Sequence, residues 1–201
     1  MTSPRVAILI SGRGSNMTAI LDAAERQDWD CTFALVLSNN SDAKGLDRAA
    51  ERGIPTAVCD HRPYGRKRRR EFDAELVRIL REHDVDWVVL AGFMRILSPV
   101  FVDAFPGRIL NIHPSLLPAF GGKGMYGLNV HRAVLSRGCL WTGATVHVVT
   151  EAYDEGPILA QRPVPVLPGD TPESLQGRVL QTEYALYPQA VMDLISRYRS
   201  R

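Results

Sequence analysis

The sequence has little cysteine, little net charge and no long hydrophobic run. Its three cysteines, Cys31, Cys59 and Cys139, are far apart and form no C-x-x-C pair, so we expect buried thiols rather than a disulfide framework or a zinc site. The apolar run at 6–10 is too short for a signal-peptide core or a membrane span. The net charge of +2 is too small for the whole chain to attract nucleic acid. These absences favour a cytoplasmic protein without a membrane partner.

The size and composition suit one globular domain, which we expect to occupy residues 1–201. The chain has 201 residues, of which 45% are hydrophobic and 23% are charged, and one domain takes roughly 150 residues. This composition excludes a coiled-coil or disordered chain. A chain of this size buries on the order of 70% of its extended surface, so it needs no disulfide or structural metal to keep a core.

The first half of the chain alternates between apolar runs typical of buried strands and segments with helical periodicity. Val6–Ile10 is a continuous run rich in β-branched residues, which suits a strand buried on both faces of a parallel sheet. The alternation predicts an α/β fold with a Rossmann-like, doubly wound, mainly parallel sheet, whose ligands lie beyond the carboxyl ends of the strands. The expected strands are 6–10, 31–37, 56–59, 85–90 and 108–112, with helices at 16–27 and 43–52 and a third marked by Phe72, Leu76, Ile79 and Leu80.

The pattern changes after Pro114 and predicts mixed strands in the second half. Proline cannot donate a ladder hydrogen bond, so a strand that contains Pro163 and Pro165 should lie at a sheet edge or be broken. The expected elements are a glycine loop at 121–124, a short helix at 130–136, strands at 145–150 and 158–166, and a last helix that starts at Pro172 with Thr171 as its cap.

The loop Ser11–Asn16 lies between the first strand and the first helix. Its glycines let the backbone approach an anion, and the helix N-terminus presents free N–H groups, so a phosphate would fit here. The loop is not a Walker A motif, and Met17 replaces the third glycine of the dinucleotide fingerprint. The alternative is a tight strand-to-helix turn with Ser15 or Asn16 as the N-cap.

Asn111 and His113 close a strand, and the two-residue period points both to one side while Ile112 faces the other. An amide N–H can stabilise a developing oxyanion and an imidazole can carry a proton, which suits a reaction in which a carbonyl becomes tetrahedral. A structural role for His113 remains the alternative. Taken alone, Asp154 indicates a turn, because Asp and Gly before Pro are turn formers. The absence of H-E-x-x-H and G-x-S-x-G motifs makes metalloproteases and α/β-hydrolases poor fits.

An unbroken basic run extends over Arg66–Arg70. The simplest interpretation is a solvated face at the start of a helix. Recognition of a small phosphorylated or carboxylated ligand, or of RNA, is the alternative.

Six segments form an ordered set of motifs that covers nearly the whole chain: Ile10–Asn16, Leu90–Ser98, Asn111–Pro118, Thr142–His147, Asp154–Ile158 and Glu183–Pro188. Together they resemble the folate-dependent formyltransferases, and among them the phosphoribosylglycinamide formyltransferases of purine biosynthesis. Methionyl-tRNA formyltransferase and formyltetrahydrofolate hydrolase share this fold but carry an extra C-terminal or N-terminal domain. A length of 201 residues has room for neither, so we expect the smallest type of formyltransferase.

The resemblance implies transfer of a formyl group from 10-formyltetrahydrofolate, used as a cosubstrate without a metal, to the amine of N1-(5-phosphoribosyl)glycinamide. It implies an N-terminal half that binds the ribonucleotide phosphate, and a C-terminal half for folate and catalysis. The implied catalytic residues are Asn111, His113 and Asp154, and those on the ribonucleotide are Gly14, Ser15, Asn16 and Glu183. The implied folate contacts are Arg69, Met94, Arg95, Ile96, Leu97, Asn111, Thr150, Glu151, Ala152, Tyr153 and Asp154.

Small-molecule substrates are therefore the expected partners, without nucleic acid, and a homodimer is a further possibility. Two alternatives stay open. A 10-formyltetrahydrofolate hydrolase would consume the same folate without an amine acceptor. A non-catalytic RNA-binding or nucleotide-binding protein would use the basic run, but it would leave Asn111, His113 and Asp154 without a role.

Overall fold

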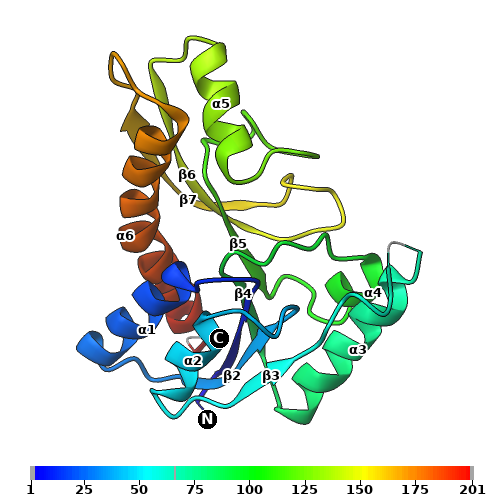
Figure 1. Cartoon of the computed structure of the whole chain (residues 1–201). Helices are drawn as coiled ribbons and strands as arrows, with labels where there is room; N and C mark the ends of the chain where they lie inside the picture. Colours follow the sequence, from blue (N-terminus) through cyan, green and yellow to red (C-terminus); the bar gives the residue numbers. More distant parts are fainter. Residues whose placement is uncertain (1–2, 66, 200–201) are drawn as a thin grey trace.

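The computed structural model describes residues 3–65 and 67–199, in which a seven-stranded sheet lies between layers of helices (Figure 1). The strands are β1 Arg5–Ile10, β2 Thr32–Ser38, β3 Thr56–Val58, β4 Trp87–Leu90, β5 Ile109–His113, β6 Trp141–Val148 and β7 Ile158–Pro165. The helices are α1 Ser15–Gln27, α2 Gly45–Ala50, α3 Arg69–Glu82, α4 Pro99–Val102, α5 Leu128–Ser136 and α6 Pro172–Arg199.

The sheet has the order β3-β2-β1-β4-β5-β6-β7 and is mainly parallel. Strands β1 to β5 pair in parallel, whereas β6 is antiparallel to both β5 and β7. The predicted doubly wound sheet with mixed C-terminal strands is therefore confirmed. The chain runs outward from β1 to β3 and then returns to place β4 on the other side of β1. In open α/β sheets, ligands bind in the crevice beyond the carboxyl ends of two such strands.

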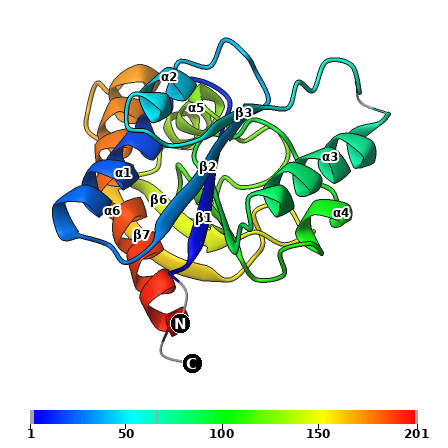
Figure 2. The ribbon, with the colours of Figure 1, turned by 90° about the horizontal axis from the view of Figure 1, so that it is seen from below.

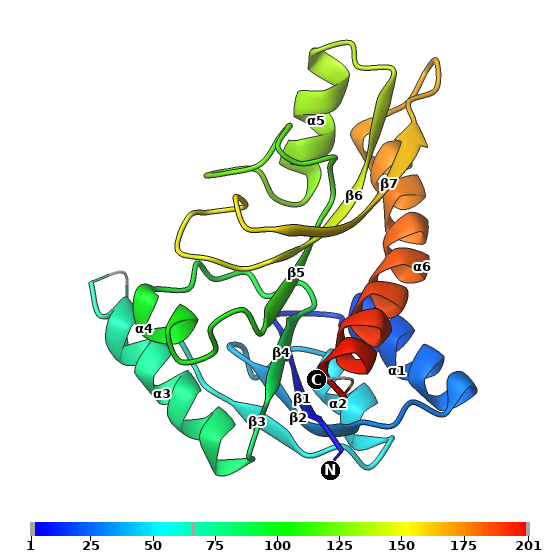
Figure 3. The same cartoon turned by 180° about the vertical axis from the view of Figure 1, so that it is seen from behind.

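Each face of the sheet is covered by its own hydrophobic core. Helices α1, α2, α5 and α6 lie on one face, and α3 and α4 lie on the other (Figures 2 and 3). Strand β1 contributes side chains to both cores, since Val6, Ile8 and Ile10 pack on the first side and Ala7 and Leu9 on the second. All five side chains are fully buried, as the continuous apolar run predicts.

The proline-containing strand and the last helix lie as the sequence predicts. Strand β7 is at one edge of the sheet, where Pro163 and Pro165 need no ladder donor. Helix α6 begins at Pro172, and the Ser174 N–H donates to the Thr171 hydroxyl at 3.2 Å, which confirms the cap. Among the described residues, no helix is both long and apolar enough to cross a membrane.

Two elements differ from the sequence pattern. Strand β6 begins at Trp141 rather than at 145, because pairing with β7 extends up to Pro165. Helix α4 is not predicted, since its four residues are too few to show a helical period. Its start is set by a distant side chain: the Ser98 N–H donates to the buried Asp73 carboxylate at 2.6 Å.

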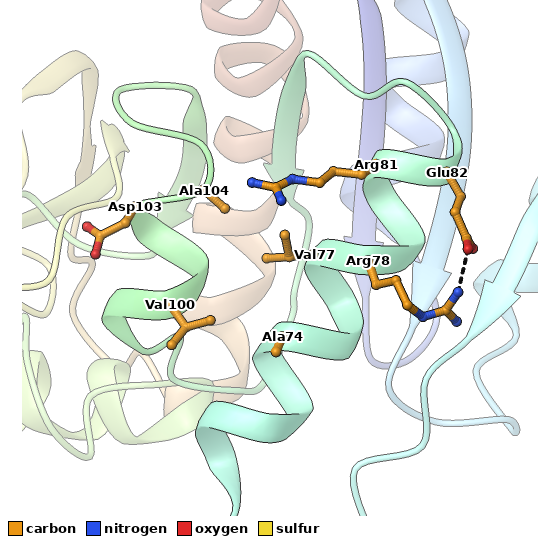
Figure 4. Close-up of a pocket in the computed structure, with 8 residues that line it drawn as sticks. All are labelled: Ala74, Val77, Arg78, Arg81, Glu82, Val100, Asp103 and Ala104. Carbon is orange, nitrogen blue, oxygen red and sulfur yellow. Dashed lines mark hydrogen bonds and ion pairs between the residues drawn. The ribbon is translucent and has the colours of Figure 1, made fainter.

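A groove of about 680 Å³ lies between α3 and α4 (Figure 4). Small apolar side chains, including Val77 and Val100, line it next to charged ones, and an ion pair joins Arg78 to Glu82 on α3. The other lining residues are Ala74, Arg81, Asp103 and Ala104. Because none of them is a predicted site residue, the candidate site lies elsewhere.

Candidate active site

Strand β5 presents Asn111 and His113 on the side of the sheet predicted from the strand period. The intervening Ile112 packs into the core under α6, so the two polar side chains face away from that core. Pairing with antiparallel β6 places His147 opposite Asn111 and Thr145 opposite His113. The edge of β5 and β6 therefore carries an amide and two imidazoles close together.

Asp154 joins this group from the turn between β6 and β7. Its Oδ2 lies 3.6 Å from His113 Nδ1 and its Oδ1 lies 3.8 Å from His147 Nε2. The Asp154 side chain is 7% exposed, and the Gly122 N–H donates to its Oδ2 at 2.9 Å. Its backbone has φ 59°, a left-handed conformation that side-chain-bearing residues rarely adopt and that clusters at functional sites. The structure thus brings together Asn111, His113 and Asp154.

His147 belongs to the same group, although the sequence does not single it out. Its Nδ1 donates to the Val148 carbonyl at 3.1 Å, so Nε2 is the acceptor for the Asn111 side-chain amide at 3.1 Å. Burial lowers the pKa of His147 below its usual value, which favours this neutral form. His147 therefore fixes the amide orientation of Asn111 and leaves the second hydrogen of the Asn111 NH₂ group available.

Both ring nitrogens of His113 are engaged by the protein. While Nδ1 faces Asp154, Nε2 donates to the Phe120 carbonyl at 2.8 Å. Phe120 itself has φ 56°, which is strained for a bulky residue. Next to this pair, burial and the neighbouring His113 lower the pKa of His131 on α5 to about 4, so His131 is uncharged at neutral pH.

The turn after β5 is held in place by polar contacts with β6 and β7. Thr145 accepts the Leu117 N–H at 3.0 Å and donates to the Ser115 carbonyl at 2.7 Å. Gln161 on β7 donates to the Leu117 carbonyl at 2.9 Å. The Leu117–Pro118 peptide bond in this turn is cis. The turn that carries Phe120 is therefore anchored at its base.

The Ser11–Asn16 loop forms a backbone cradle at the start of α1. Gly14 is the N-cap with φ 69°, and no side chain caps the helix, so the alternative of a Ser15 or Asn16 cap is wrong. A Cβ on Gly14 would lie 3.0 Å from the Gly45 Cα, which shows how closely the loop packs against α2. The uncapped first-turn N–H groups of α1 are the donors that an anion would use.

Glu183 reaches this cradle from α6. The Asn16 amide donates to Glu183 Oε2 at 2.7 Å, and the buried Asn16 Oδ1 has no hydrogen-bond partner in the described part of the chain. Burial raises the pKa of Glu183 to about 7. The structure therefore brings together Gly14, Ser15, Asn16 and Glu183, as the resemblance implies, and leaves an acceptor next to the anion cradle.

The Met94–Leu97 segment follows β4 on the other side of the crevice. Met94 and Ile96 are exposed to 54% and 44%, whereas Leu97 is buried and Arg95 lies over the Phe72 ring at 6.0 Å. Apolar side chains exposed in this way beside a crevice suit a flat, partly apolar ligand.

The turn from Thr150 to Asp154 adds a second wall of the candidate folate site. The Thr150 hydroxyl donates to the Ala152 carbonyl at 3.2 Å, and Glu151 and Ala152 are exposed. Tyr153 is 39% exposed, and burial of its hydroxyl raises its pKa.

The basic run divides into residues with different surroundings, and Arg66 lies outside the described residues. Lys67 and Arg70 are exposed, and Arg68 is exposed while it pairs with Glu71 at 3.4 Å. Arg69, at the first position of α3, is the half-buried one among the four that are described. Burial raises the pKa of Asp73, and the positive charge of Arg69 opposes that rise.

Metal ligation is not indicated by the described ranges 3–65 and 67–199, where no group of three His, Cys, Asp or Glu side chains could hold an ion. The three cysteines are unpaired thiols, and burial raises the pKa of both Cys31 and Cys59 to about 11.

Comparison with known proteins identifies relatives over nearly the whole chain. The sequence pattern of the formyl transferase family matches residues 4–191. The chain is 46% identical over 187 residues to the trifunctional purine biosynthetic protein adenosine-3 of Gallus gallus, covering 93% of this chain and 18% of the relative. It is 44% identical to the chloroplastic phosphoribosylglycinamide formyltransferase of Arabidopsis thaliana, covering 93% of this chain and 64% of that protein.

A solved structure agrees with these sequence matches. The fold is similar to that of glycinamide ribonucleotide transformylase 1 from Symbiobacterium toebii, with a TM-score of 0.88 and 43% identity over 97% of this chain and 89% of the other. The chain thus spans less than two thirds of the chicken and Arabidopsis relatives and most of the bacterial one. A match to the family pattern over residues 4–191, on a fold that agrees closely, identifies the chain as a member of the formyl transferase family.

Proposed function

We propose that this protein transfers the formyl group of 10-formyltetrahydrofolate to the amine of N1-(5-phosphoribosyl)glycinamide, a step of purine biosynthesis. The observation that carries the proposal is the convergence of Asn111, His113 and Asp154, with His147 behind them, beside an uncapped helix N-terminus. The family match and relatives named for this reaction support it. We further infer a cytoplasmic enzyme in which residues 1–201 form one domain, and a homodimer stays a prediction.

The ribonucleotide phosphate would bind the N–H groups at the start of α1, where Gly14 lets the backbone approach it. Asn16 Oδ1 is buried without a partner among the residues that the structure describes. Together with the Glu183 carboxylate it offers acceptors for hydroxyl groups of the ligand. The phosphate would then lie at the carboxyl end of β1, and the rest of the ligand would extend toward β4 and β5.

The folate would lie between Met94–Leu97 and the turn Thr150–Asp154. The exposed side chains of Met94, Ile96 and Tyr153 supply apolar surface, and Arg69 and Arg95 supply positive charge for a carboxylate of the ligand. The formyl group would then meet the amine next to Asn111 and His113. Holding two substrates in register is worth roughly 7–11 kcal/mol in well-aligned reactions.

In the reaction, the amine nitrogen attacks the formyl carbon, and the carbonyl oxygen becomes an oxyanion. The free hydrogen of the Asn111 NH₂ group and a protonated His113 stabilise that oxygen. Asp154 faces His113 and stabilises its imidazolium form. When the tetrahedral intermediate collapses, the bond from carbon to the folate nitrogen breaks. One proton then passes from the attacking nitrogen to the leaving nitrogen with help from His113.

The Phe120 carbonyl bears on this step. It accepts the hydrogen bond of His113 Nε2. If the oxyanion of the tetrahedral intermediate accepts that hydrogen bond instead, it replaces the Phe120 carbonyl as the partner of His113.

Folate turnover measured by ultraviolet absorbance tests the proposal. The protein is mixed with 10-formyltetrahydrofolate or its 5,8-dideaza analogue, with and without the ribonucleotide. Turnover that requires the ribonucleotide supports the transferase, turnover without it indicates a hydrolase, and no turnover by folded protein contradicts both.

Asp154→Asn is the matched test of the proposed catalytic group. It should lower kcat by about 10²-fold or more, because it removes the charge facing His113 but keeps the side-chain shape. Asp103→Asn, at an exposed site on the α3–α4 groove, is the control and should leave kcat unchanged. An Asp154→Asn variant with the rate and pH profile of the wild type contradicts the role given to Asp154.

A further inference from the structure

Ser11 lies at the point where the two proposed half-sites meet. It follows β1 and begins the loop that forms the anion cradle, and its N–H donates to the Gly92 carbonyl at 3.2 Å. Its hydroxyl accepts the N–H of Met94, the first residue of the candidate folate segment, at 2.7 Å. The side chain of one residue thus bridges the loops after β1 and β4, the two strands that flank the ligand crevice.

The bridge continues through Asn39 and His61, which follow β2 and β3. The Met94 N–H can only donate, so the single proton of the Ser11 hydroxyl is free for Asn39 Oδ1, which lies 2.5 Å away. Asn39 is 4% exposed, and its Nδ2 is 3.0 Å from His61 Nδ1. The same His61 Nδ1 lies 2.9 Å from the Asn39 carbonyl, so His61 contacts both the backbone and the side chain of Asn39. These contacts connect the carboxyl ends of four strands.

We propose that Ser11 is a positioning residue that couples ribonucleotide binding to folate binding. This inference depends on the proposed function, because it assigns one substrate to each loop that Ser11 joins. A phosphate on the N–H groups of the cradle holds the loop that begins at Ser11, and the Ser11 hydroxyl in turn holds the Met94 backbone at the folate wall. The second substrate then meets a loop that is already ordered, and by linkage the effect is the same in either order of binding.

Titration calorimetry measures this coupling directly. The probe is 5,8-dideazafolate, which has no formyl group to transfer, titrated with and without saturating N1-(5-phosphoribosyl)glycinamide. In the wild type the ribonucleotide should tighten folate binding. In Ser11→Ala about threefold to tenfold of that gain should disappear, the range expected for one hydrogen bond.

Two further measurements separate coupling from a general structural effect. Ser41→Ala is the matched control, since the exposed Ser41 hydroxyl donates to the neighbouring Asp42 carboxylate at 3.3 Å, and it should retain the full coupling. Amide hydrogen exchange in the wild type needs no variant. Exchange at the Met94 N–H should slow when the ribonucleotide alone is added, because the Ser11 hydroxyl holds that group.

The outcomes are distinct. Any one of three results overturns the inference. The coupling could be undiminished in Ser11→Ala, or that variant could lose affinity equally for both ligands taken alone. The third is an exchange rate at the Met94 N–H that the ribonucleotide does not change. If the wild type transfers formyl groups in the same preparation, such a result leaves the proposed function intact. A wild type that binds neither ligand overturns the proposed function, and the coupling with it.

Discussion

Replacement of Glu183 by glutamine should make the folded protein more stable at neutral pH and should lower its affinity for the ribonucleotide. Glu183 is 7% exposed on α6, and the Asn16 amide donates to its Oε2 at 2.7 Å. Burial opposes ionisation and raises the pKa of Glu183 to about 7, although the Asn16 hydrogen bond acts the other way. A glutamine keeps an acceptor for Asn16 and never carries the charge.

The size of the effect follows from the pKa of Glu183 in the folded and unfolded chain. The unfolded value is the ordinary 4.5, so between pH 4.5 and about 7 the folded chain holds more protons, and its stability falls as pH rises. At about 1.4 kcal/mol per pKa unit, the penalty reaches roughly 3 kcal/mol above pH 7 and is absent well below pH 4.5. The variant should therefore gain up to roughly 3 kcal/mol at pH 8 and less than about 1 kcal/mol at pH 5.

Urea unfolding of wild type and Glu183→Gln at pH 5 and pH 8 measures this difference. Glu173→Gln, at an exposed site on the same helix, is the control and should show little dependence on pH. In the activity assay, Glu183→Gln should raise KM for the ribonucleotide and leave KM for the folate unchanged. The reasoning is refuted if the two proteins differ equally at both pH values, or if the variant is the less stable one at pH 8.

Three other substitutions test the supports of the site. His147→Phe removes the acceptor that orients the Asn111 amide. In steady-state assays kcat should fall about tenfold or more, while the KM values of the substrates change little. An unaltered kcat contradicts the orienting role of His147. Gly156→Ala would place a Cβ 1.8 Å from the Val148 carbonyl oxygen, and urea unfolding should show a loss of about 2 kcal/mol or more. Tyr187→Phe removes the buried hydroxyl that donates to the Leu90 and Leu110 carbonyls at 3.0 and 3.1 Å. Thermal unfolding should show a loss of about 1–3 kcal/mol in the free energy of unfolding. An unchanged stability shows that those carbonyls find other donors.

The parallel half of the sheet could be predicted from local sequence because buried parallel strands are continuous apolar runs. Val6–Ile10 shows this most clearly, since it serves a core on each face. Helix α4 escaped prediction because a helix of four residues has no period to detect, and its start depends on Asp73, which is 25 residues away in the chain.

The candidate site was predictable to different degrees. The strand period alone placed Asn111 and His113 on one side, whereas Asp154 became a candidate only by resemblance. The neighbours of Asp154 nevertheless predicted a turn, and the left-handed backbone of Asp154, with φ 59°, is a conformation found in turns. His147 was missed because its role depends on the register between β5 and β6, and register between distant strands leaves no local trace in the sequence.

A stagger between the two halves of the sheet creates the site. Strand β4 ends at Leu90, which pairs with Asn111, while β5 continues to His113 against β6 alone. Because β6 is antiparallel, its own end at Val148 lies at the level of Leu110, and the turn that follows it brings Asp154 back to His113 and His147. The register of β6 against β5 therefore supplies the second imidazole, and the turn after β6 supplies the carboxylate, at the end of β5 where the proposed reaction would take place.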